Sequence, residues 1–346
     1  MNKLMLIGSG TVHTFRFYRL VRELFSEVIP VTDQHPEGFE DIKPVAARFE
    51  IRNPLKAYQN IKHLERLIEQ HQPDIIHVHQ ANSTSWLALK ANKKFKKPLL
   101  VTSWGSDILV HPFRSHLIRR MVKEILQKAD AFTADAQVVA EKMKFLAGNP
   151  QLNVTVVNLG IELFKCKGPK ENIIYSNRLH QPNYRIDKVI DAFARFRERN
   201  SDWQLVIAGS GPGTERLKQY AQKRCPEGSV IFTGWLKTEE NREWYCRSKI
   251  FISIPESDAT AVSLLEAMWA GCIPVVSDTP AAKEWIRHGE NGIVATLPDN
   301  DFLPEALQLD SEKVAETNRA LVEEKATEKA CRETFARIYS SLSATV

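Results

Sequence analysis

Two carboxylates separated by seven residues, Asp258 and Glu266, flank the start of an apolar segment with helical periodicity at residues 261–270. A strand-like run at residues 250–254 ends just before them. The first N–H groups of a helix have no partner within it and lie at the positive end of its dipole, which favours a diphosphate there. One carboxylate could then accept hydrogen bonds from sugar hydroxyls and the other from ribose hydroxyls. The alternative is that Asp258 only caps the helix and that Glu266 is a solvated helix residue.

Two arginines follow another strand-like run, at residues 172–176. Arg178 comes directly after this run, and Arg185 comes a short loop later. At the carboxyl end of a strand, facing a cleft, both could bind a pyrophosphate, because the planar fork of a guanidinium matches its oxygens. Two solvated loop arginines explain the spacing equally well.

Glycine-containing turns lie between strand-like and helical segments. Gly209 opens one such turn, and Gly10 lies in the first turn of the chain. Glycine lets N–H groups approach a phosphate at the start of a helix, but a tight turn without a ligand needs the same residue. A further strand-like run ends in Trp235 and Leu236, an apolar wall on which a nucleobase could stack. Trp235 could equally be an ordinary packing residue.

The elements that must position these residues are short apolar, β-branched runs that alternate with helical segments. This alternation predicts parallel β-α-β units, and therefore an α/β fold with doubly wound sheets. The predicted strands form two sets, residues 4–7, 75–79, 99–102 and 154–157, then residues 172–176, 204–208, 230–233, 250–254 and 273–277. Predicted helices include residues 55–70, 188–198 and 261–270, and a charged helical tail at residues 311–341, beyond Pro298.

The two sets of strands are separated by residues 160–170, a polar segment that contains glycine and proline and is typical of a linker. A chain of 346 residues also exceeds the size at which one core keeps growing. We therefore predict two Rossmann-like domains, residues 1–162 and 163–324, facing an interdomain cleft. Open parallel sheets bind ligands beyond the carboxyl ends of their strands, so the cleft is the expected binding site.

Composition excludes several classes of protein. With 43% apolar and 26% charged residues, the chain is an ordinary globular protein. The apolar run at the N-terminus is too short for a secretory signal, and no run approaches the roughly 18 apolar residues that span a bilayer. The five cysteines are odd in number and widely spaced, so the sequence predicts neither a disulfide framework nor a zinc site. We expect a cytoplasmic protein.

The segment from Asp258 to Glu266, with the residues after it up to Val276, resembles the E-x7-E signature of the retaining GT-B glycosyltransferases of family four. The likeness covers nearly the whole chain. In the second half it includes Arg178-Leu179 and residues 208–212, 232–234, 284–286 and 291–292, in the order of the family. In the first half, residues 74–79 and 104–107 are similar to landmarks of the acceptor-binding domain.

This resemblance implies a role for each matching residue. Glu266 would hold the ribose, Arg178 the diphosphate and Asp258 the donor sugar, and these three would be the catalytic residues. Gly10 would approach the diphosphate from the other domain, and a last helix at about residues 325–346 would pack back on the first domain. The implied donor-binding residues are Gly10, Arg178, Arg185, Gly209, Trp235, Leu236, Asp258, Thr260, Ala261, Val262, Ser263, Leu264 and Glu266. The implied acceptor-side residues are His13, His79, Trp104 and Asp107.

Three positions depart from the family pattern. Asp258 stands where glutamate is usual, so its carboxylate is set back by one methylene and would meet the donor sugar differently. Tyr184 replaces a lysine expected several residues after Arg178, with Arg185 beside it as a possible substitute. Trp104 replaces a histidine usually placed near the donor sugar, which removes one hydrogen bond.

The resemblance also implies a mechanism. The anomeric carbon of a UDP- or GDP-sugar is attacked from the face that the nucleotide leaves, so no protein nucleophile, cofactor or bound metal is required. Arg178 and the helix start near Ala261 would stabilise the departing diphosphate, and the donor's own phosphate would take the acceptor's proton. The acceptor would be a glycan or a lipid-linked glycan, in the synthesis of cell-surface polysaccharide, lipopolysaccharide or capsule.

Two other function classes remain open. A GT-B sugar-nucleotide epimerase would need acidic and histidine side chains around the sugar, for which His13, His79 and Asp258 are candidates. A catalytically silent nucleotide-sugar-binding protein would keep the nucleotide site without turnover, and Trp104 and Asp258 are the features that motivate this alternative.

The net charge of +5 is unevenly spread, since residues 1–160 contain 22 Lys and Arg against 15 Asp and Glu. Much of the excess lies at residues 90–97 and 114–128. Apolar residues in or next to the second stretch include Phe113, Leu117, Ile118, Met121 and Ile125. This face could rest on an anionic membrane at the inner surface, although a solvated helix with a buried face explains it nearly as well. No module that reads nucleic acid is recognisable, and we expect no nucleic-acid partner.

Overall fold

The computed structural model describes residues 3–296 and 302–344 and divides into two compact units. Unit 1 comprises Met1–Leu159 and Glu328–Val346, and unit 2 comprises Gly160–Thr327. The division thus falls three residues before the predicted boundary at residue 162, and the last helix belongs to unit 1. The expected linker, residues 160–170, is part of unit 2.

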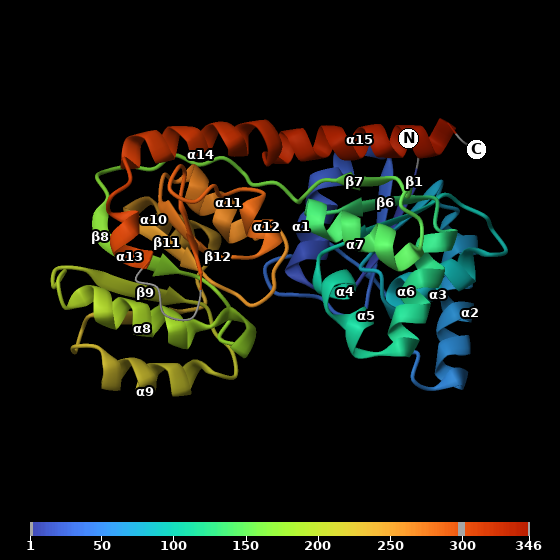
Figure 1. Ribbon diagram of the computed structural model, residues 1–346. Coiled ribbons are helices and arrows are strands. Elements are labelled where there is room, and N and C mark those ends of the chain that lie inside the picture. Colours follow the sequence, from blue (N-terminus) through green and yellow to red (C-terminus); the bar gives the residue numbers. More distant parts are fainter. Residues whose placement is uncertain (1–2, 297–301, 345–346) are drawn as a thin grey trace. The chain divides into compact units, whose positions relative to one another are not determined.

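The strands described in unit 1 form one parallel sheet in the order β3-β2-β1-β4-β5-β6-β7, the pattern of a doubly wound fold. Figure 1 labels β1, β6 and β7 of this sheet. The strands are β1 (Lys3–Gly8), β2 (Glu27–Thr32), β3 (Val45–Ala46), β4 (Ile75–His79), β5 (Leu99–Ser103), β6 (Ala131–Ala134) and β7 (Val154–Val156). The helices are α1 (Val12–Val21), η1 (Arg22–Leu24), α2 (Pro54–His71), α3 (Ser83–Asn92), α4 (Ser106–Leu109), α5 (His111–Arg114), α6 (His116–Lys128), α7 (Gln137–Ala147) and α15 (Glu328–Ala344).

The last helix, α15, completes the core of unit 1. Phe335 and Tyr339 on α15 are fully buried. The Phe335 ring lies 4.7 Å from that of Phe17 on α1, and the Tyr339 hydroxyl lies 2.7 Å from His77 Nδ1 on β4. Leu4 and Leu6 of β1 belong to the same cluster. This element from the end of the chain is therefore part of the structure that supports β1 and β4.

The strands described in unit 2 form a second parallel sheet, in the order β10-β9-β8-β11-β12-β13 (Figure 1). The strands are β8 (Glu171–Ser176), β9 (Gln204–Ala208), β10 (Val230–Gly234), β11 (Ser248–Ser253), β12 (Ile273–Ser277) and β13 (Ile293–Ala295). The helices are η2 (Pro182–Tyr184), α8 (Ile186–Arg197), α9 (Thr214–Arg224), α10 (Thr238–Arg247), α11 (Val262–Trp269), α12 (Pro280–Lys283), α13 (Phe302–Ala306) and α14 (Ser311–Lys325).

Both faces of the unit 2 sheet are covered. Alternate residues of one strand face opposite layers: Ile174 of β8 packs in the cluster with α8 and α9, whereas Ile173 and Tyr175 pack in the cluster with α10 and α11. Because both faces are apolar, these strands have continuous hydrophobic sequences rather than an alternating pattern. Their carboxyl ends lead into the loops that carry the predicted site residues.

All nine predicted strands are present, but β2, β3, β6 and β13 were not predicted. The shortest two, β3 and β13, have two and three residues, too few for any periodicity to show. β2 contains Pro30, which cannot donate to a ladder and argues against a strand. β6, with the sequence AFTA, has only one large apolar side chain.

The charged tail is two helices rather than the single predicted helix. α14 ends at Lys325 and α15 begins at Glu328. Between them, the carbonyl of Ala326 accepts a hydrogen bond from the N–H of Ile161 (2.8 Å), and Thr327 forms a β-bridge with Ile161. These contacts use backbone groups of the connecting residues, so the helical ladder stops there. Pro298 lies outside the described residues.

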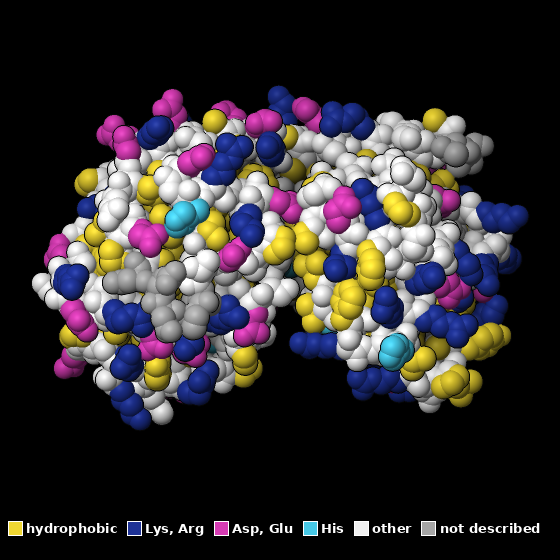
Figure 2. Space-filling view, in the orientation of Figure 1, with side chains coloured by type: hydrophobic (Ala, Val, Ile, Leu, Met, Phe, Trp, Pro, Cys, Tyr) yellow, Lys and Arg dark blue, Asp and Glu magenta, His cyan; other side chains and the backbone are white. Residues whose placement is uncertain are grey.

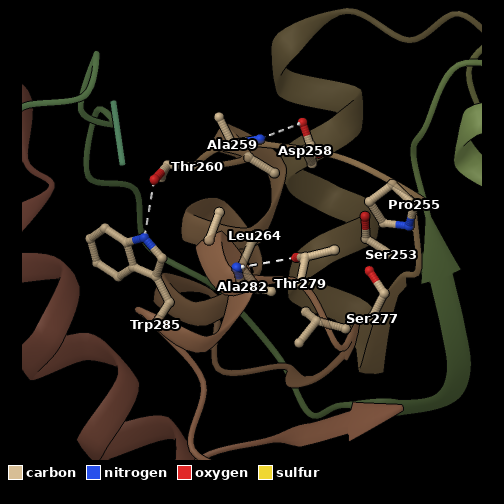
Figure 3. A pocket seen from close by; sticks show the side chains of 13 residues that line it. Ser253, Pro255, Asp258, Ala259, Thr260, Leu264, Ser277, Thr279, Ala282 and Trp285 are labelled. Carbon is tan, nitrogen blue, oxygen red and sulfur yellow. Dashed lines mark hydrogen bonds between the residues drawn. The ribbon is translucent and has the colours of Figure 1, made fainter. Parts of the chain in front are cut away.

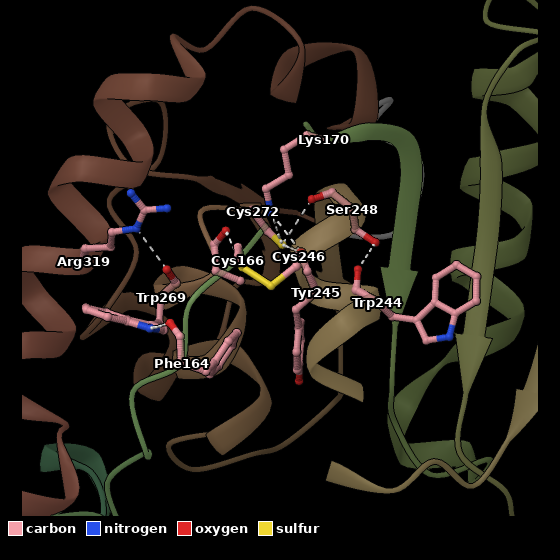
Figure 4. Close-up of a disulfide and its surroundings, with 11 residues drawn as sticks. Phe164, Cys166, Lys170, Trp244, Tyr245, Cys246, Ser248, Trp269, Cys272 and Arg319 are labelled. Carbon is pink, nitrogen blue, oxygen red and sulfur yellow. Dashed lines mark hydrogen bonds between the residues drawn. A yellow bond between two sulfur atoms is a disulfide. The ribbon is translucent and has the colours of Figure 1, made fainter. Parts of the chain in front are cut away.

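The cysteine prediction was wrong, because Cys166 and Cys246 form a disulfide (Figure 4). The two residues are separated by 80 positions, and no spacing motif in the sequence marks them as a pair. The other three cysteines, Cys225, Cys272 and Cys331, are free and buried. Structural disulfides are rare in reducing compartments, so the cysteines no longer support a cytoplasmic location. In the described ranges, no helix has the length and apolar content needed to cross a membrane.

Candidate functional site

The strand ends of unit 2 bring Arg178 and Asp258 together, although 80 residues separate them in sequence. Arg178 follows β8, and Asp258 lies in the loop between β11 and α11. The guanidinium donates from Nη2 to Asp258 Oδ2 (2.5 Å) and from Nη1 to the hydroxyl of Ser263 (2.7 Å), in the first turn of α11. Arg178 is therefore fixed against the start of this helix.

The guanidinium carbon, Cζ, of Arg178 lies over the Tyr184 ring, 4.5 Å from its centre. The Arg178 side chain is only 11% exposed. Its Nε is buried and has no hydrogen-bond partner among the described residues. A buried donor without a partner is costly, so this group is suited to a ligand or an ordered water.

Arg185 does not share this arrangement. It adopts a left-handed backbone conformation (φ 50°), and its Nε donates to Glu256 Oε1 (3.3 Å). Its charge is thus balanced within the loop. It is Tyr184, rather than Arg185, that contacts Arg178 at the position of the family's lysine.

Glu266 lies on the side of α11 that faces α10 and β8. Burial raises the pKa of Tyr245 well above its usual value, and the negative charge of Glu266 is the second cause. The pKa of Tyr175 is raised by burial and by Glu266 in the same way. Tyr245 is fully buried, and its hydroxyl accepts a hydrogen bond from Asn177 Nδ2 (2.7 Å). Glu266 is partly buried and is not a freely solvated helix residue.

The start of α11 is preceded by Ala261, and among the described residues no side chain caps the helix at this position. Asp258 instead accepts a hydrogen bond from the N–H of Ala259 (3.1 Å), so the alternative in which Asp258 caps the helix was wrong. The N–H of Leu264 is used within the helix, on the carbonyl of Ala261 (3.0 Å). Val262 and Ser263 carry the N–H groups that a helix start leaves without an intrahelical partner.

A small cavity lies behind the loop of Asp258 and is lined in part by Thr260, Ser277 and Trp285 (Figure 3). Its volume of about 20 Å³ has room for one water and no sugar. Trp285 Nε1 donates to Thr260 Oγ1 (3.3 Å), which ties the loop to the end of α12. The Ser277 hydroxyl is buried without a partner among the described residues, which suits a water in this space.

Gly209 serves the packing of two loops. A Cβ at this position would lie 2.7 Å from the carbonyl oxygen of Arg178, and its φ of +101° is one that other residues rarely adopt. Its N–H donates to the carbonyl of Gly234 (2.8 Å).

Trp235 follows β10 and is 69% exposed, whereas Leu236 is half-buried against the core. The exposed indole is available for stacking on a planar group.

In unit 1, the N–H of Gly10 donates to Asp33 Oδ1 (2.8 Å). A Cβ on Gly10 would lie 2.1 Å from the carbonyl oxygen of Gln34. The close packing of these two loops thus accounts for this glycine, as in the alternative of a tight turn without a ligand.

His79, at the end of β4, is 1% exposed, and its ring lies 5.2 Å from that of Trp104. Burial, with a smaller contribution from His13, lowers the pKa of His79 to about 3, so the ring is neutral. Neither ring nitrogen of His79 nor the indole nitrogen of Trp104 has a hydrogen-bond partner among the described residues. The exposed His13 ring stacks on Trp104 at 6.4 Å. Three of the four predicted acceptor-side residues therefore form one aromatic cluster.

Asp107 belongs to the framework of this cluster. It is 1% exposed and accepts hydrogen bonds from the N–H of Ala81 (2.7 Å), the hydroxyl of Ser103 (3.0 Å) and the N–H of Trp104 (3.3 Å). Burial raises the pKa of Asp107, and these hydrogen bonds oppose the rise. Its carboxylate orients the loop after β5.

Several residues around the site were not predicted from the sequence. Asn177 and Tyr245 lie against Glu266, yet nothing in the sequence distinguishes them from other residues of a strand end and a helix. The Ser263 hydroxyl contacts Arg178, whereas only its backbone was expected to take part. Within the described residues, no group of three or more His, Cys, Asp or Glu side chains is arranged to hold a metal ion.

Comparison with known proteins matches each unit to a family model. Residues 3–136 match the family "Glycosyl transferase 4-like", and residues 164–326 match "Glycosyl transferases group 1". An alpha-monoglucosyldiacylglycerol synthase from Streptococcus pneumoniae is 24% identical over 72% of this chain and 63% of its own length. A sulfoquinovosyl transferase from Arabidopsis thaliana is 26% identical over 78% of this chain and 56% of its own length. The chain thus spans less than two thirds of these relatives.

Solved structures agree on the fold. Anabaena HepE, crystallised in complex with UDP, superimposes with a TM-score of 0.82 at 17% identity, covering 99% of this chain and all of HepE. An identity this low supports the architecture and not the ligand. The two-domain α/β prediction is confirmed by this match, and the two family models together match more than half of the chain. The chain therefore belongs to the GT-B glycosyltransferases, similar to those of family four.

Proposed function

We propose that this protein transfers a sugar from a UDP- or GDP-sugar to a glycan or lipid-linked acceptor, with retention of anomeric configuration. The observation that carries the proposal is the placement of Arg178, which Asp258 and Ser263 hold against the first turn of α11. A guanidinium and a helix start at one point make a site for a diphosphate. HepE, a protein of the same fold, was crystallised with UDP, so a UDP-sugar is the first donor to test.

In the proposed reaction, Arg178 and the N–H groups at the start of α11 stabilise the negative charge that develops as the diphosphate leaves. Glu266 accepts hydrogen bonds from the ribose, and Trp235 covers the base. The acceptor oxygen bonds directly to the anomeric carbon as the bond to the phosphate breaks, so no protein nucleophile takes part, and the acceptor's proton passes to the departing phosphate. Arg178 and the helix start, rather than a bound metal, balance the charge of the diphosphate. Transfer should therefore persist when EDTA is added.

The proposed acceptor is lipid-linked, in the assembly of a cell-surface glycan. Support comes from the relative in Streptococcus pneumoniae, whose name includes a diacylglycerol. Unit 1 also has an apolar and basic face around α5, α6 and α7 (Figure 2). On it, Leu117 is 81%, Phe145 59% and Phe113 48% exposed. Arg119 lies 5.9 Å and Lys142 5.2 Å from the ring of Phe113, so cations border the apolar side chains. Such a surface suits the inner, anionic leaflet of a membrane.

The donor site is tested by a thermal-shift screen with UDP, GDP, ADP and their sugars, followed by transfer assays. Arg178→Ala should lower kcat/KM by about a hundredfold or more, and Glu266→Ala should weaken donor binding. Arg247→Ala removes an arginine paired with Glu171 elsewhere in unit 2 and should have little effect. Full transfer activity in Arg178→Ala and Glu266→Ala would refute the assignment, as would an epimerised donor in the absence of acceptor.

The membrane face is tested by co-sedimentation with liposomes that contain anionic phospholipid. The double variant Phe113→Ser, Leu117→Ser should bind at least several-fold more weakly than the wild type, because burial of each apolar side chain contributes roughly 1.5–3 kcal/mol. Leu307→Ser, at a position 42% exposed in unit 2, is the matched control. Equal sedimentation of all three proteins, or no binding of the wild type at low salt, would dispose of this part of the proposal.

A further inference from the structure

Two positions at which the chain departs from the family pattern, Tyr184 and Asp258, contact the same guanidinium. The guanidinium carbon of Arg178 lies over the Tyr184 ring, 4.5 Å from its centre, and Asp258 accepts a hydrogen bond from one terminal nitrogen. The hydroxyl of Ser263 holds the other terminal nitrogen (2.7 Å). Three segments of unit 2 thus enclose one side chain: η2, the loop after β11 and the first turn of α11.

The loops that carry Tyr184 and Asp258 are also bound to each other. Asn183 Nδ2 donates to the carbonyl of Ser257 (3.0 Å), and the N–H of Ser257 donates back to Asn183 Oδ1 (3.3 Å). The N–H of Glu256 donates to the carbonyl of Asn183 (2.8 Å). Because Asn183 precedes Tyr184 directly, these bonds set the position of the ring relative to Asp258.

We propose that Tyr184 is a positioning residue: its ring fixes the guanidinium of Arg178 in the orientation that receives the diphosphate. The inference rests on the proposed function of this site and adds a residue to it. An arginine side chain loses much rotational freedom when it binds an anion, and an aromatic ring below its plane reduces that loss beforehand. Nε of Arg178 is buried without a hydrogen-bond partner among the described residues, so the protein itself does not use this donor.

The same geometry explains how the site functions with tyrosine where the family has a lysine. Arg185 is held by Glu256 at 3.3 Å, so it does not supply a second free cation beside Arg178. The ring of Tyr184 adds no charge but makes the one guanidinium rigid. Binding of the diphosphate then depends on the orientation of Arg178 more than on the number of positive charges.

The test compares Tyr184→Phe, which keeps an aromatic ring, with Tyr184→Leu, which keeps apolar volume only. Dissociation constants are measured by calorimetry for UDP and, by competition, for uridine, which lacks the diphosphate. Tyr184→Phe should bind UDP within about twofold of the wild type, and Tyr184→Leu should bind UDP roughly threefold to thirtyfold more weakly. The affinity for uridine should be the same in all three proteins. If the wild type prefers GDP, then GDP and guanosine replace UDP and uridine.

Tyr220→Leu is the matched control, because Tyr220 is also a half-buried tyrosine packed on the same core cluster, and its hydroxyl bonds to Asp191 (2.7 Å). Tyr220→Leu should leave the ratio of the dissociation constants for UDP and uridine unchanged. In an Arg178→Ala background, Tyr184→Leu should have no further effect on UDP, since it acts through Arg178.

Three results would overturn the inference: unchanged UDP affinity in Tyr184→Leu, an equal loss for UDP and uridine, or an equal loss in the Arg178→Ala background. If the wild type binds no nucleoside diphosphate, the proposed function itself fails. Failure of the inference alone leaves UDP binding and its dependence on Arg178 intact, so the two failures are distinguishable.

Discussion

At Gly209, the lack of a side chain determines how closely two loops of unit 2 approach each other. A Cβ on Gly209 would lie only 2.7 Å from the carbonyl oxygen of Arg178, and the N–H of Gly209 donates to the carbonyl of Gly234. Arg178 owes its orientation to its contacts with Asp258, Ser263 and Tyr184, but its backbone position depends on this glycine. A change at Gly209 should therefore affect the proposed diphosphate site through the backbone of Arg178.

Gly209→Ala should lower the free energy of unfolding by about 1–3 kcal/mol and weaken UDP binding, because it adds both backbone strain and a clash. Gly228→Ala separates the two effects: Gly228 also has a positive φ, of +73°, but no atom lies within 4 Å of a Cβ there. Urea unfolding and calorimetric titration with UDP measure the outcome. Equal UDP affinity in both variants would show that the contact with Arg178 is unimportant.

At the scale of elements, the segment after Gly160 is fastened to α10 and α11 (Figure 4). Cys166 is bonded to Cys246 at the end of α10, and the carbonyl of Phe164 accepts a hydrogen bond from Trp269 Nε1 (2.7 Å). α10 also carries Tyr245, which lies against Glu266. The disulfide therefore stabilises α10, the helix that packs against Glu266, which is proposed to bind the ribose.

The double variant Cys166→Ser, Cys246→Ser should lower the free energy of unfolding by roughly 2–4 kcal/mol, since the bond closes a long loop. Dithiothreitol should shift the urea midpoint of the wild type and leave that of the variant unchanged. Thiol titration of the denatured wild type should give three free groups without reductant and five with it. A wild-type midpoint that is insensitive to dithiothreitol would contradict this account.

The sequence predicts the long, apolar strands and helices of this fold well. It predicts poorly the contacts that depend on the conformation of the loops. The approach of Arg178 and Asp258 follows from two strand ends at one edge of a parallel sheet. Their direct ion pair, and the ring of Tyr184 beside them, depend on loop conformations that no periodicity encodes. The same holds for the pairing of Cys166 with Cys246, which requires knowledge of where the segment after Gly160 runs.

At the scale of the whole molecule, buried histidines make stability depend on pH. His77 is fully buried, with its ring nitrogens bonded to Tyr339 and Thr102, and His79 beside it is 1% exposed. Burial lowers the pKa of His77 well below its usual value and that of His79 to about 3. Both are neutral in the folded state, whereas the unfolded chain binds a proton on each below about pH 6.5.

Stability should therefore be complete above pH 6.5 and fall as the pH drops toward 3. His79 should contribute about 2 kcal/mol of this loss between pH 6.5 and pH 5, and His77 should add a loss in the same direction. His79→Phe keeps an aromatic ring in an aromatic site, and it should lose about 2 kcal/mol less than the wild type over that range. His116→Gln, at an exposed position, is the control. Urea midpoints at several pH values measure the effect, and identical pH slopes for wild type and His79→Phe would refute it.

The position of α15 in the chain has a consequence for synthesis. The strands of unit 1 leave the ribosome first, but Phe335 and Tyr339, which fill its core, are made only after all 168 residues of unit 2 (Gly160–Thr327). At about 5–20 residues per second, that interval lasts roughly 10 to 30 s. During this time β1 and α1 lack their cover, while unit 2 already has every residue that it needs. We therefore expect unit 1 to complete its core after unit 2, and its nascent form to be the more open to aggregation and to chaperones.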